Sequence, residues 1–436
     1  RLRLLEQPNL GGSGGFSRAM LETIDVDHSS YVLLLDDDVV CEPEGIARAV
    51  AFADHARRPT IVGGHMFSMY QRSVLHAFAE VVIPWQFRWA AADPTRHDHD
   101  LAASNLRSTP WLHRRMDVDY NGWWMCLIPV DVIRDVGLSL PLFIKWDDAE
   151  YGLRASAAGY ATVSLPGAAV WHVPWTDKDD SVDWQAYFHA RNRFVAALLH
   201  SPFAFGGRMV RESLAIQVKH LLGMQYSAAA LRQLALRDVL AGPERLHAEL
   251  PLKLSEVRAA RADHPDAQVR PDPEEFAAVR RGRPRKRDLV TARPAGSLAT
   301  VTAAVGGLVR QALPVRPSAG EHPERHVPAA DAGWWSLSRL DSALVSTTDG
   351  TGVSWHRRDR GLALRALRES AALHQRLLRE WPTLARRYRA ALTELAGQDA
   401  WRKTLEAAPH RDEFATGTAT GTATGTATGI AGGTRR

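Results

Sequence analysis

The stretch Tyr-Val-Leu-Leu-Leu-Asp-Asp-Asp-Val-Val, at residues 31–40, decides the fold of this chain. Its apolar half is typical of a strand buried on both faces of a parallel sheet, and such sheets bind ligands at the carboxyl ends of their strands. In extended backbone Asp36 and Asp38 point the same way, and Asp37 points the opposite way. Because adjacent carboxylates repel one another, the pattern predicts a Mg²⁺ or Mn²⁺ site at Asp36 and Asp38. A solvated acidic turn is the alternative.

The composition is that of a globular protein with room for two or three domains. The chain has 436 residues, of which 45% are hydrophobic and 24% charged. A net charge of +5 permits an anionic partner without requiring one. Cys41 and Cys126 form no CxxC motif, so we expect no disulfide framework and a reducing, cytoplasmic location. No apolar run is long enough for a transmembrane helix. The chain begins without Met, in a strand-like run at residues 2–5, so we expect its natural N-terminus to be missing.

Residues 1–200 alternate strand and helix patterns, which predicts an α/β domain with a mostly parallel sheet. Strands are expected at 31–35 and 60–64, with a helix between them. A glycine-rich segment at 8–15 is expected to be a loop that opens a helix at Phe16. Such loops can bring backbone N–H groups close to phosphate, although a tight turn is the alternative.

The second half of the chain has mainly helical patterns. Residues 201–262 and 331–410 are predicted to be helical, with breaks near Gly242-Pro243 and Pro251. Residues 263–330, which are rich in Pro and Arg, are predicted to be a linker. Residues 411–436 repeat a four-residue unit without apolar content, and we expect them to be disordered.

A second acidic cluster, Asp147-Asp148, follows Pro141 and precedes a predicted helix at 150–158. Carboxylates at a helix start are favoured by the helix dipole, which is one explanation. The other is a general base in the same pocket as the metal. Because neighbouring residues in a helical turn point about 100° apart, at most one of the two can face a given hydroxyl group.

Three further motifs each allow two interpretations. His172 follows a predicted strand and is either structural or a third metal ligand, which would favour Mn²⁺ over Mg²⁺. Trp123 and Trp124 are either core residues or flat platforms for sugar rings. The basic run at 280–287 is a solvated linker, a DNA minor-groove binder or a segment attracted to an anionic membrane.

Residues 7 to about 192 resemble the mycobacterial-type galactan galactofuranosyltransferases, which are UDP-galactofuranosyl transferases of glycosyltransferase family 2 with a GT-A fold. The helical region to about residue 407 resembles the C-terminal helical domain of this family. The motifs that carry the resemblance lie at 7–15, 36–38, 113–115, 117–124, 143–148 and 171–172, extended by 183–189.

The resemblance implies a role for particular residues. Asp148 would be the general base, with Asp147 beside it on the acceptor side. The other implied roles are the metal ligands Asp36, Asp38 and His172, the donor-binding residues Asn9, Asp36, Gly11 and Gly12, and the sugar-binding residues Glu80, Trp89, Trp123, Trp124 and His189.

The resemblance also implies a metal-dependent, inverting transfer of galactofuranose from UDP-galactofuranose to a lipid-linked galactan of the cell wall. A homo-oligomer at the inner face of the plasma membrane, in peripheral contact with anionic lipid, is expected, and no nucleic acid. The family's N-terminal β-sandwich domain and first strand of the nucleotide fold have no counterpart here, so this chain alone could be inactive. The alternatives are a transferase with another nucleotide-sugar donor, or an inactive fragment that binds anionic membrane or nucleic acid through its basic helical half.

Overall fold

A mixed eight-stranded sheet is the framework of the N-terminal half. The structure is a computed structural model that describes residues 3–175, 179–280 and 293–407. The strands of the sheet are β1 (Tyr31–Leu35), β2 (Val40–Cys41), β3 (Thr60–Ser68), β4 (Val74–Ala77), β7 (His99–Asp100), β8 (Met116–Val118), β9 (Met125–Pro129) and β10 (Ala161–His172). Its central order is β1-β9-β3-β10-β2, with β4, β7 and β8 off this path.

The prediction of a mostly parallel sheet is wrong for the described strands. Among the described strands of this eight-stranded sheet, only β3 and β10 pair in parallel, and the other pairs are antiparallel. The alternation of strand and helix does make β1 and β3 run in the same direction. However, β9 enters from much later in the chain and lies between them, antiparallel to both.

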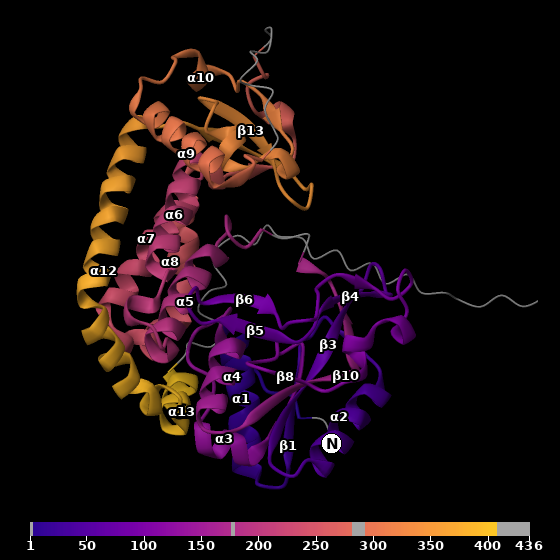
Figure 1. Ribbon diagram of the computed structural model, residues 1–436. Helices are drawn as coiled ribbons and strands as arrows, with labels where there is room; N and C mark the ends of the chain where they lie inside the picture. The colour runs from indigo at the N-terminus through magenta and orange to yellow at the C-terminus, as the bar shows by residue number, and fades with distance from the viewer. Residues whose placement is uncertain (1–2, 176–178, 281–292, 408–436) are drawn as a thin grey trace, which may run out of the picture.

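Helices cover both faces of this sheet (Figure 1). Val32 and Leu34 of β1 pack in a core shared with the first helix, whereas Leu33 and Leu35 face the core that contains α2. The strand is therefore apolar on both faces, as its sequence predicts. The helices of this half are α1 (Gly11–Val26), α2 (Pro43–His55), α3 (Val130–Val136) and α4 (Asp147–Ala157), and the two-stranded sheet beside them is β5 (Glu80–Ile83) with β6 (Arg88–Ala91).

Residues 8–10 of the glycine-rich segment lie outside any helix or strand, but residues 11–15 belong to α1, because the helix begins at Gly11 and not at Phe16. Gly11 has a φ of +71°, and a Cβ atom there would lie 2.1 Å from the Phe143 carbonyl oxygen. The glycine thus allows the helix start to touch the segment that leads to α4. The described residues of the predicted strand at 2–5 form no strand.

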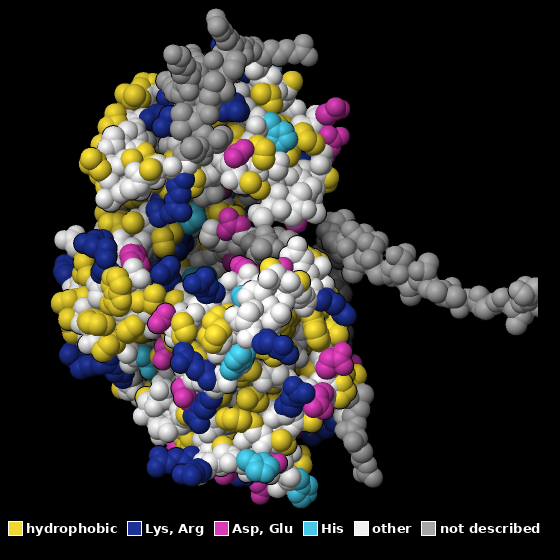
Figure 2. Space-filling view, turned by 45° about the vertical axis from the view of Figure 1, so that its right-hand side comes forward, with side chains coloured by type: hydrophobic (Ala, Val, Ile, Leu, Met, Phe, Trp, Pro, Cys, Tyr) yellow, Lys and Arg dark blue, Asp and Glu magenta, His cyan; other side chains and the backbone are white. Residues whose placement is uncertain are grey.

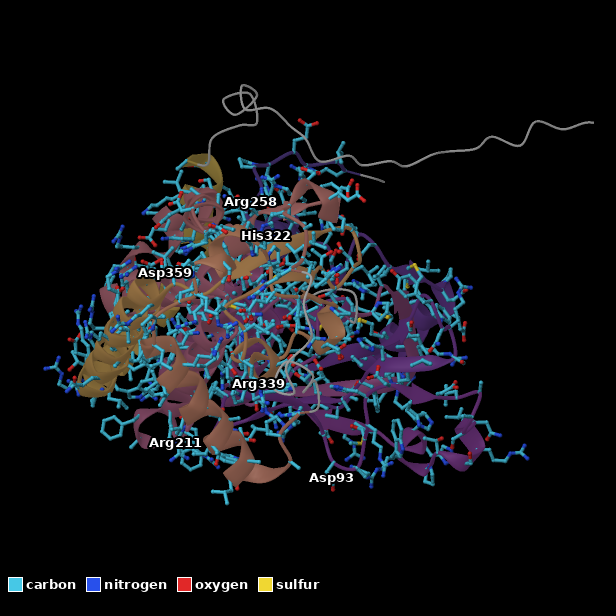
Figure 3. The ribbon with its side chains drawn as sticks, turned by 90° about the horizontal axis from the view of Figure 1, so that it is seen from above. Asp93, Arg211, Arg258, His322, Arg339 and Asp359 are labelled. Atoms are coloured by element: carbon cyan, nitrogen blue, oxygen red, sulfur yellow. The ribbon has the colours of Figure 1, made fainter. Side chains whose placement is uncertain are left out.

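A bundle of helices packs against the α/β half (Figures 1 and 3). Helix α12 runs along its outer side, and α13 returns to the α/β half, where Trp401 Nε1 donates to the Ser139 carbonyl oxygen at 2.7 Å. Asp359, labelled in Figure 3, caps α12 by accepting from the Leu362 N–H at 2.8 Å. The bundle helices are α5 (Gln185–His200), α6 (Met209–Leu222), α7 (Tyr226–Ala241), α8 (Leu246–Ala262), α12 (Arg360–Leu395) and α13 (Gln398–Ala407).

A small four-stranded sheet occupies the region that we expected to be linker and helix. It contains the hairpin β13–β14, and α9 packs close to it (Figure 1). Helix α8 also continues through Pro251, while the break at Gly242-Pro243 is present. The added elements are β11 (Val269–Arg270), α9 (Gly296–Ala312), α10 (Ser318–Glu321), β12 (His326–Val327), α11 (Trp334–Leu337), β13 (Ser342–Ser346) and β14 (Val353–Arg357).

A buried carboxylate explains why this region folds despite its many Pro and Arg residues. The Asp341 carboxylate accepts from Arg310 at 2.7 Å and from Arg358 at 2.8 Å, so two arginines become structural. Most of the basic run, residues 281–287, and the repeat tail at 411–436 lie outside the described residues. Short 3₁₀ turns complete the chain at η1 (Leu106–Ser108), η2 (Pro110–His113), η4 (Ala204–Gly206), η5 (Pro243–Arg245), η6 (Pro265–Ala267), η7 (Pro273–Glu275) and η9 (Ala329–Asp331).

Candidate active site

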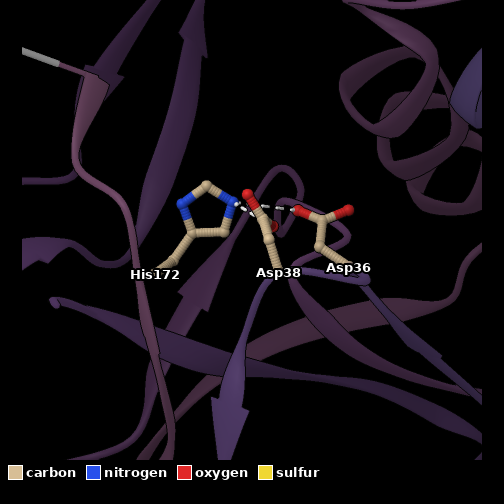
Figure 4. A group of neighbouring side chains, drawn as sticks. All are labelled: Asp36, Asp38 and His172. Atoms are coloured by element: carbon tan, nitrogen blue, oxygen red, sulfur yellow. Dashed lines mark ion pairs between the residues drawn. The ribbon is translucent and has the colours of Figure 1, made fainter. Parts of the chain in front are cut away.

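Asp36, Asp38 and His172 form one group, although more than 130 residues of sequence separate the aspartates from the histidine (Figure 4). Asp36 directly follows β1, and His172 is the last residue of β10. His172 Nε2 lies 3.0 Å from Asp38 Oδ1 and 3.6 Å from Asp36 Oδ2, and all three ligand atoms lie within 4.8 Å of one another. Two carboxylates and one imidazole are a donor set that suits Mn²⁺ or Mg²⁺.

The structure separates Asp37 from the other two aspartates, although Asp37 and Asp38 lie in a turn and not in the extended backbone that the sequence led us to expect. The Asp37 side chain is exposed and lies outside the group of potential ligand atoms. Burial raises the pKa of Asp36, His172 partly offsets this effect, and the charges of Asp38 and Asp37 add to it. A divalent cation would remove the repulsion within the cluster.

Asp147 and Asp148 are the first two residues of α4, and Asp148 lies within electrostatic reach of Asp36. Burial raises the pKa values of both carboxyl groups, and the charge of Asp36 raises that of Asp148 further. Asp147 is only 7% exposed and faces the first turn of α1, where a Cβ atom on Gly12 would lie 3.5 Å from Asp147 Oδ2. A carboxylate with a raised pKa is suited to accepting a proton near neutral pH.

Glu80 lies on the other side of Asp148, at the start of β5. Burial raises the pKa of Glu80 to about 7, a hydrogen bond from Tyr120 opposes that shift, and the charge of Asp148 adds to it. His97 Nε2 lies 3.5 Å from Glu80 Oε1. The structure therefore brings Glu80 and Asp148 within electrostatic reach of each other.

Trp89 and His189 meet beside Trp146, the residue that precedes Asp147. The ring centroid of Trp89 lies 4.9 Å from that of Trp146 and 5.1 Å from that of His189. The buried indole N–H groups of Trp89 and Trp146 have no hydrogen-bond partner among the described residues. Two unused donors next to each other are a feature expected where a polar ligand, such as a sugar, binds.

Trp123 and Trp124 are buried in two different cores, which favours the core interpretation that the sequence left open. Trp123 packs edge-on against Phe16 and Tyr151, with ring centroids 5.1 and 5.7 Å apart. Trp124 Nε1 donates to the Gly64 carbonyl oxygen at 2.8 Å. Their role as sugar platforms stays a prediction.

The side chain of Asn9 is used within the protein. Its Oδ1 atom accepts from the Gly11 N–H at 3.0 Å and so supports the start of α1. Gly11 and Gly12 lie in the first turn of this helix, close to Phe143 and Asp147 respectively. The helix start therefore lies near the acidic pocket, where its backbone dipole favours an anion.

Several residues near the site were missed by sequence reasoning. Tyr120 and Trp146 lie inside the motifs that carry the resemblance, at 117–124 and 143–148. Membership of these motifs could have marked both residues as neighbours of the site. His97 gives no such signal, because it lies in a loop whose position depends on the pairing of β4 with β7.

Comparisons with known proteins agree with this geometry. The glycosyltransferase like family 2 matches residues 1–197, and galactofuranosyltransferase-2, domain 3, matches residues 209–407. A protein named galactofuranosyltransferase GlfT2, from Mycolicibacterium smegmatis (strain ATCC 700084 / mc(2)155), is 43% identical over 410 residues, which are 93% of this chain and 63% of the relative. The protein of the same name from Mycobacterium tuberculosis (strain ATCC 25618 / H37Rv) is 41% identical over 418 residues, 94% of this chain and 65% of the relative.

The two matched families define the class, a family 2 glycosyltransferase domain followed by a second, family-specific region. Within that class, the chain is similar to the proteins named galactofuranosyltransferase GlfT2 along almost its whole length. It spans slightly less than two thirds of the length of the relatives described above.

Proposed function

We propose that this chain is the catalytic part of an inverting, metal-dependent galactofuranosyltransferase. The donor would be UDP-galactofuranose, and the acceptor a growing, lipid-linked galactan of the cell wall. The observation that carries the proposal is the proximity of Asp148 to the group formed by Asp36, Asp38 and His172, since the charge of Asp36 raises the pKa of Asp148. A transferase needs both a site for the donor diphosphate and a base for the acceptor hydroxyl.

Asp36, Asp38 and His172 would hold a Mn²⁺ or Mg²⁺ ion. When bound, the ion would neutralise negative charge on the UDP leaving group. The ligands come from the ends of two strands in one sheet, so their spacing is fixed by the framework. The first turn of α1, with Asn9, Gly11 and Gly12, would contact the nucleotide sugar. In this turn the Gly11 N–H already donates to Asn9 Oδ1 and the Ser13 N–H to the Phe143 carbonyl oxygen, so the Gly12 N–H would be the donor to a phosphate.

Asp148 would remove the proton from an acceptor hydroxyl, which then attacks the anomeric carbon on the face opposite to UDP. Burial favours the neutral form of Asp148, so the carboxylate gains from taking up this proton. Asp147 lies between this position and the start of α1, and it would help to orient the sugars. Glu80 and the half-buried Trp89 would bind sugar hydroxyls, with His189 as the packing partner of Trp89.

The partners beyond the two substrates are inferred from the family and from charge. No helix in the described part of the chain is both long and apolar enough to cross a membrane. Figure 2 shows Lys and Arg side chains over much of the visible face, with Asp and Glu side chains between them. We include in the proposal a homo-oligomer at the cytoplasmic face of the plasma membrane, with peripheral contact to anionic lipid.

The test is transfer by the natural full-length protein to a short synthetic galactofuranose acceptor. UDP-galactofuranose and Mn²⁺ should give an elongated product with inverted anomeric configuration, and chelation should stop the reaction. UDP-galactopyranose and UDP-glucose serve as matched donors. Faster transfer from either of them would replace the proposed donor, and no transfer from any donor would contradict the enzymatic function.

A further inference from the structure

A strained loop, residues 142–146, places the two carboxylates at the start of α4. Phe143, Lys145 and Trp146 have φ values of +71°, +70° and +70°, a region that residues other than glycine rarely adopt. Such a conformation is unfavourable for these residues and persists only where the surroundings enforce it. The loop is therefore held in a conformation that it would leave if its contacts were removed.

The side-chain amide of Asn192, on α5, contacts three backbone carbonyl groups of this loop. Its Nδ2 atom lies 2.9 Å from the oxygen of Leu142, 2.8 Å from that of Ile144 and 2.9 Å from that of Lys145. Asn192 is fully buried, so water cannot replace these hydrogen bonds. One side chain thus holds the backbone on both sides of the strained Phe143 and up to the strained Lys145.

Arg191 fixes the orientation of that amide. Its Nε atom donates to Asn192 Oδ1 at 2.8 Å, which directs the Asn192 NH₂ group toward the loop, and its Nη2 atom donates to the Leu142 carbonyl oxygen at 2.8 Å. Tyr187 OH lies 3.4 Å from Arg191 Nη1 and donates to Asp238 on α7 at 2.6 Å. The support for the loop therefore extends into the helical bundle.

On its opposite side the loop is attached to the first turn of α1. Ser13 Oγ accepts from the Phe143 N–H at 2.8 Å, and the Ser13 N–H donates to the Phe143 carbonyl oxygen at 3.1 Å. Trp146, which precedes Asp147, has no side-chain hydrogen bond that caps α4. The direction of α4, and with it the position of Asp147 and Asp148, consequently depends on the contacts made by Asn192.

We propose that Asn192 is a positioning residue for the transfer reaction, acting through the backbone of the 142–146 loop. Without its amide, the carbonyl groups of Ile144 and Lys145 lose this donor, that of Leu142 keeps Arg191 and the Ile144 N–H, and the loop relaxes toward ordinary φ values. A displacement of about 1 Å in a reacting group can cost on the order of 100-fold in rate. This inference rests on the proposed function, because it assigns Asn192 to the same site.

The experiment compares Asn192→Ala with Gln233→Ala in the natural full-length protein. Gln233 is a matched control, since it is a buried amide on α7 whose Nε2 atom donates to the Ala366 carbonyl at 2.8 Å and to Ser370 Oγ at 2.9 Å, far along the chain from the loop. Both variants should lower the melting temperature. Only Asn192→Ala should lower kcat, by about 10- to 100-fold, while KM for UDP-galactofuranose changes less than about 3-fold.

A milder variant, Arg191→Lys, decides the question if Asn192→Ala does not fold. Lysine keeps the charge but loses the Nε bond that orients the Asn192 amide, so kcat should fall about 3- to 10-fold. A folded variant with wild-type kcat, or an equal loss of kcat in Gln233→Ala, would overturn the proposal. If the wild-type protein transfers no sugar at all, the proposed function fails first, and the two failures are thereby distinguished.

Discussion

The two acidic clusters of this protein differ in burial, and this difference assigns them different chemistry. Asp36 and Asp38 follow a strand, with side chains 36% and 51% exposed, and they lie next to His172. Asp147 and Asp148 begin a helix, in a pocket that raises the pKa values of both. The more exposed cluster is open to a cation from solvent, whereas burial of the second cluster favours the protonated form of its carboxyl groups.

The comparison also shows why both clusters are needed on one framework. The strands β1 and β10 hold the first cluster rigidly, and the strained loop before α4 brings the second cluster to face it. Charge on Asp36 raises the pKa of Asp148, so a cation at the first cluster would alter the proton affinity of the second. The predictions below separate the two clusters experimentally.

The largest effect is expected for Asp148→Asn, which keeps the size of the side chain but cannot accept the proton. The kcat of the natural full-length protein should fall on the order of 1,000-fold, within the range typical of a lost general base. Affinity for UDP and Mn²⁺, measured by calorimetry, should stay within about 3-fold of wild type. A kcat within 10-fold of wild type would assign the base to another residue.

The control for this variant is Asp37→Asn. Asp37 is an exposed carboxylate that lies outside the group of potential metal ligands. Its replacement should leave kcat unchanged within about 2-fold. An equal loss in both variants would mean that general charge, and not the position of Asp148, controls the rate.

Glu80→Gln tests whether burial raises the pKa of a carboxyl group beside the second cluster. Because the folded-state pKa of Glu80 is raised from 4.5 to about 7, the folded protein binds this proton more tightly than the unfolded chain does. The stabilising contribution of the neutral Glu80 is fully present below pH 4.5 and is lost as the pH rises to about 7. Glutamine is neutral at every pH, so it removes this loss, which amounts to about 3 kcal/mol.

The measurement is urea unfolding of wild type and variant at pH 4.5 and pH 8. The free energy of unfolding of Glu80→Gln, relative to wild type, should be higher at pH 8 by up to about 3 kcal/mol. The control, Glu44→Gln on α2, replaces a side chain that is 71% exposed, and its relative stability should shift by less than about 0.5 kcal/mol. The same relative stability of Glu80→Gln at both pH values would contradict a raised pKa.

Asp38→Asn tests the first cluster by removing one charged ligand. Affinity for Mn²⁺ should fall about 10- to 100-fold, the size expected for altering a metal site, and Asp37→Asn should bind Mn²⁺ like wild type. His172→Gln should weaken Mn²⁺ binding more than Mg²⁺ binding, since imidazole prefers the former. Unchanged Mn²⁺ affinity in Asp38→Asn would contradict the metal site.

Much of this site could be predicted from the sequence, because strand ends and helix starts have local signals. The run at 31–40 predicts β1 and singles out Asp36 and Asp38, and the acidic pair indicates a helix, although α4 begins at Asp147 and not at the expected residue 150. Proximity of His172 to Asp38 agrees with the expected metal group, although its role as a ligand stays a prediction.

The errors arise where long-range pairing decides the structure. Nothing local to β9 shows that it lies antiparallel between β1 and β3, so the alternating pattern led to a mostly parallel sheet. The small sheet near β13 was missed because its strands are short and Asp341, which neutralises nearby arginines, is distant from Arg310 in sequence. The domain boundaries that we expected stay a prediction.

The smallest effects are expected for substitutions of Trp89 and Trp124, which compare a partly buried indole group with a core indole group. Trp124→Phe removes a buried hydrogen bond to the Gly64 carbonyl, so the free energy of unfolding should fall by about 1–2 kcal/mol. Trp89→Phe removes an N–H group that has no partner among the described residues, so stability should change little. If Trp89 binds sugar and Trp124 only packs, KM for a galactofuranose acceptor should rise about 5-fold in Trp89→Phe alone. A raised KM in Trp124→Phe would instead show that Trp124 binds sugar. A core residue can affect acceptor binding only by destabilising the fold, and the unfolding measurements detect that effect separately.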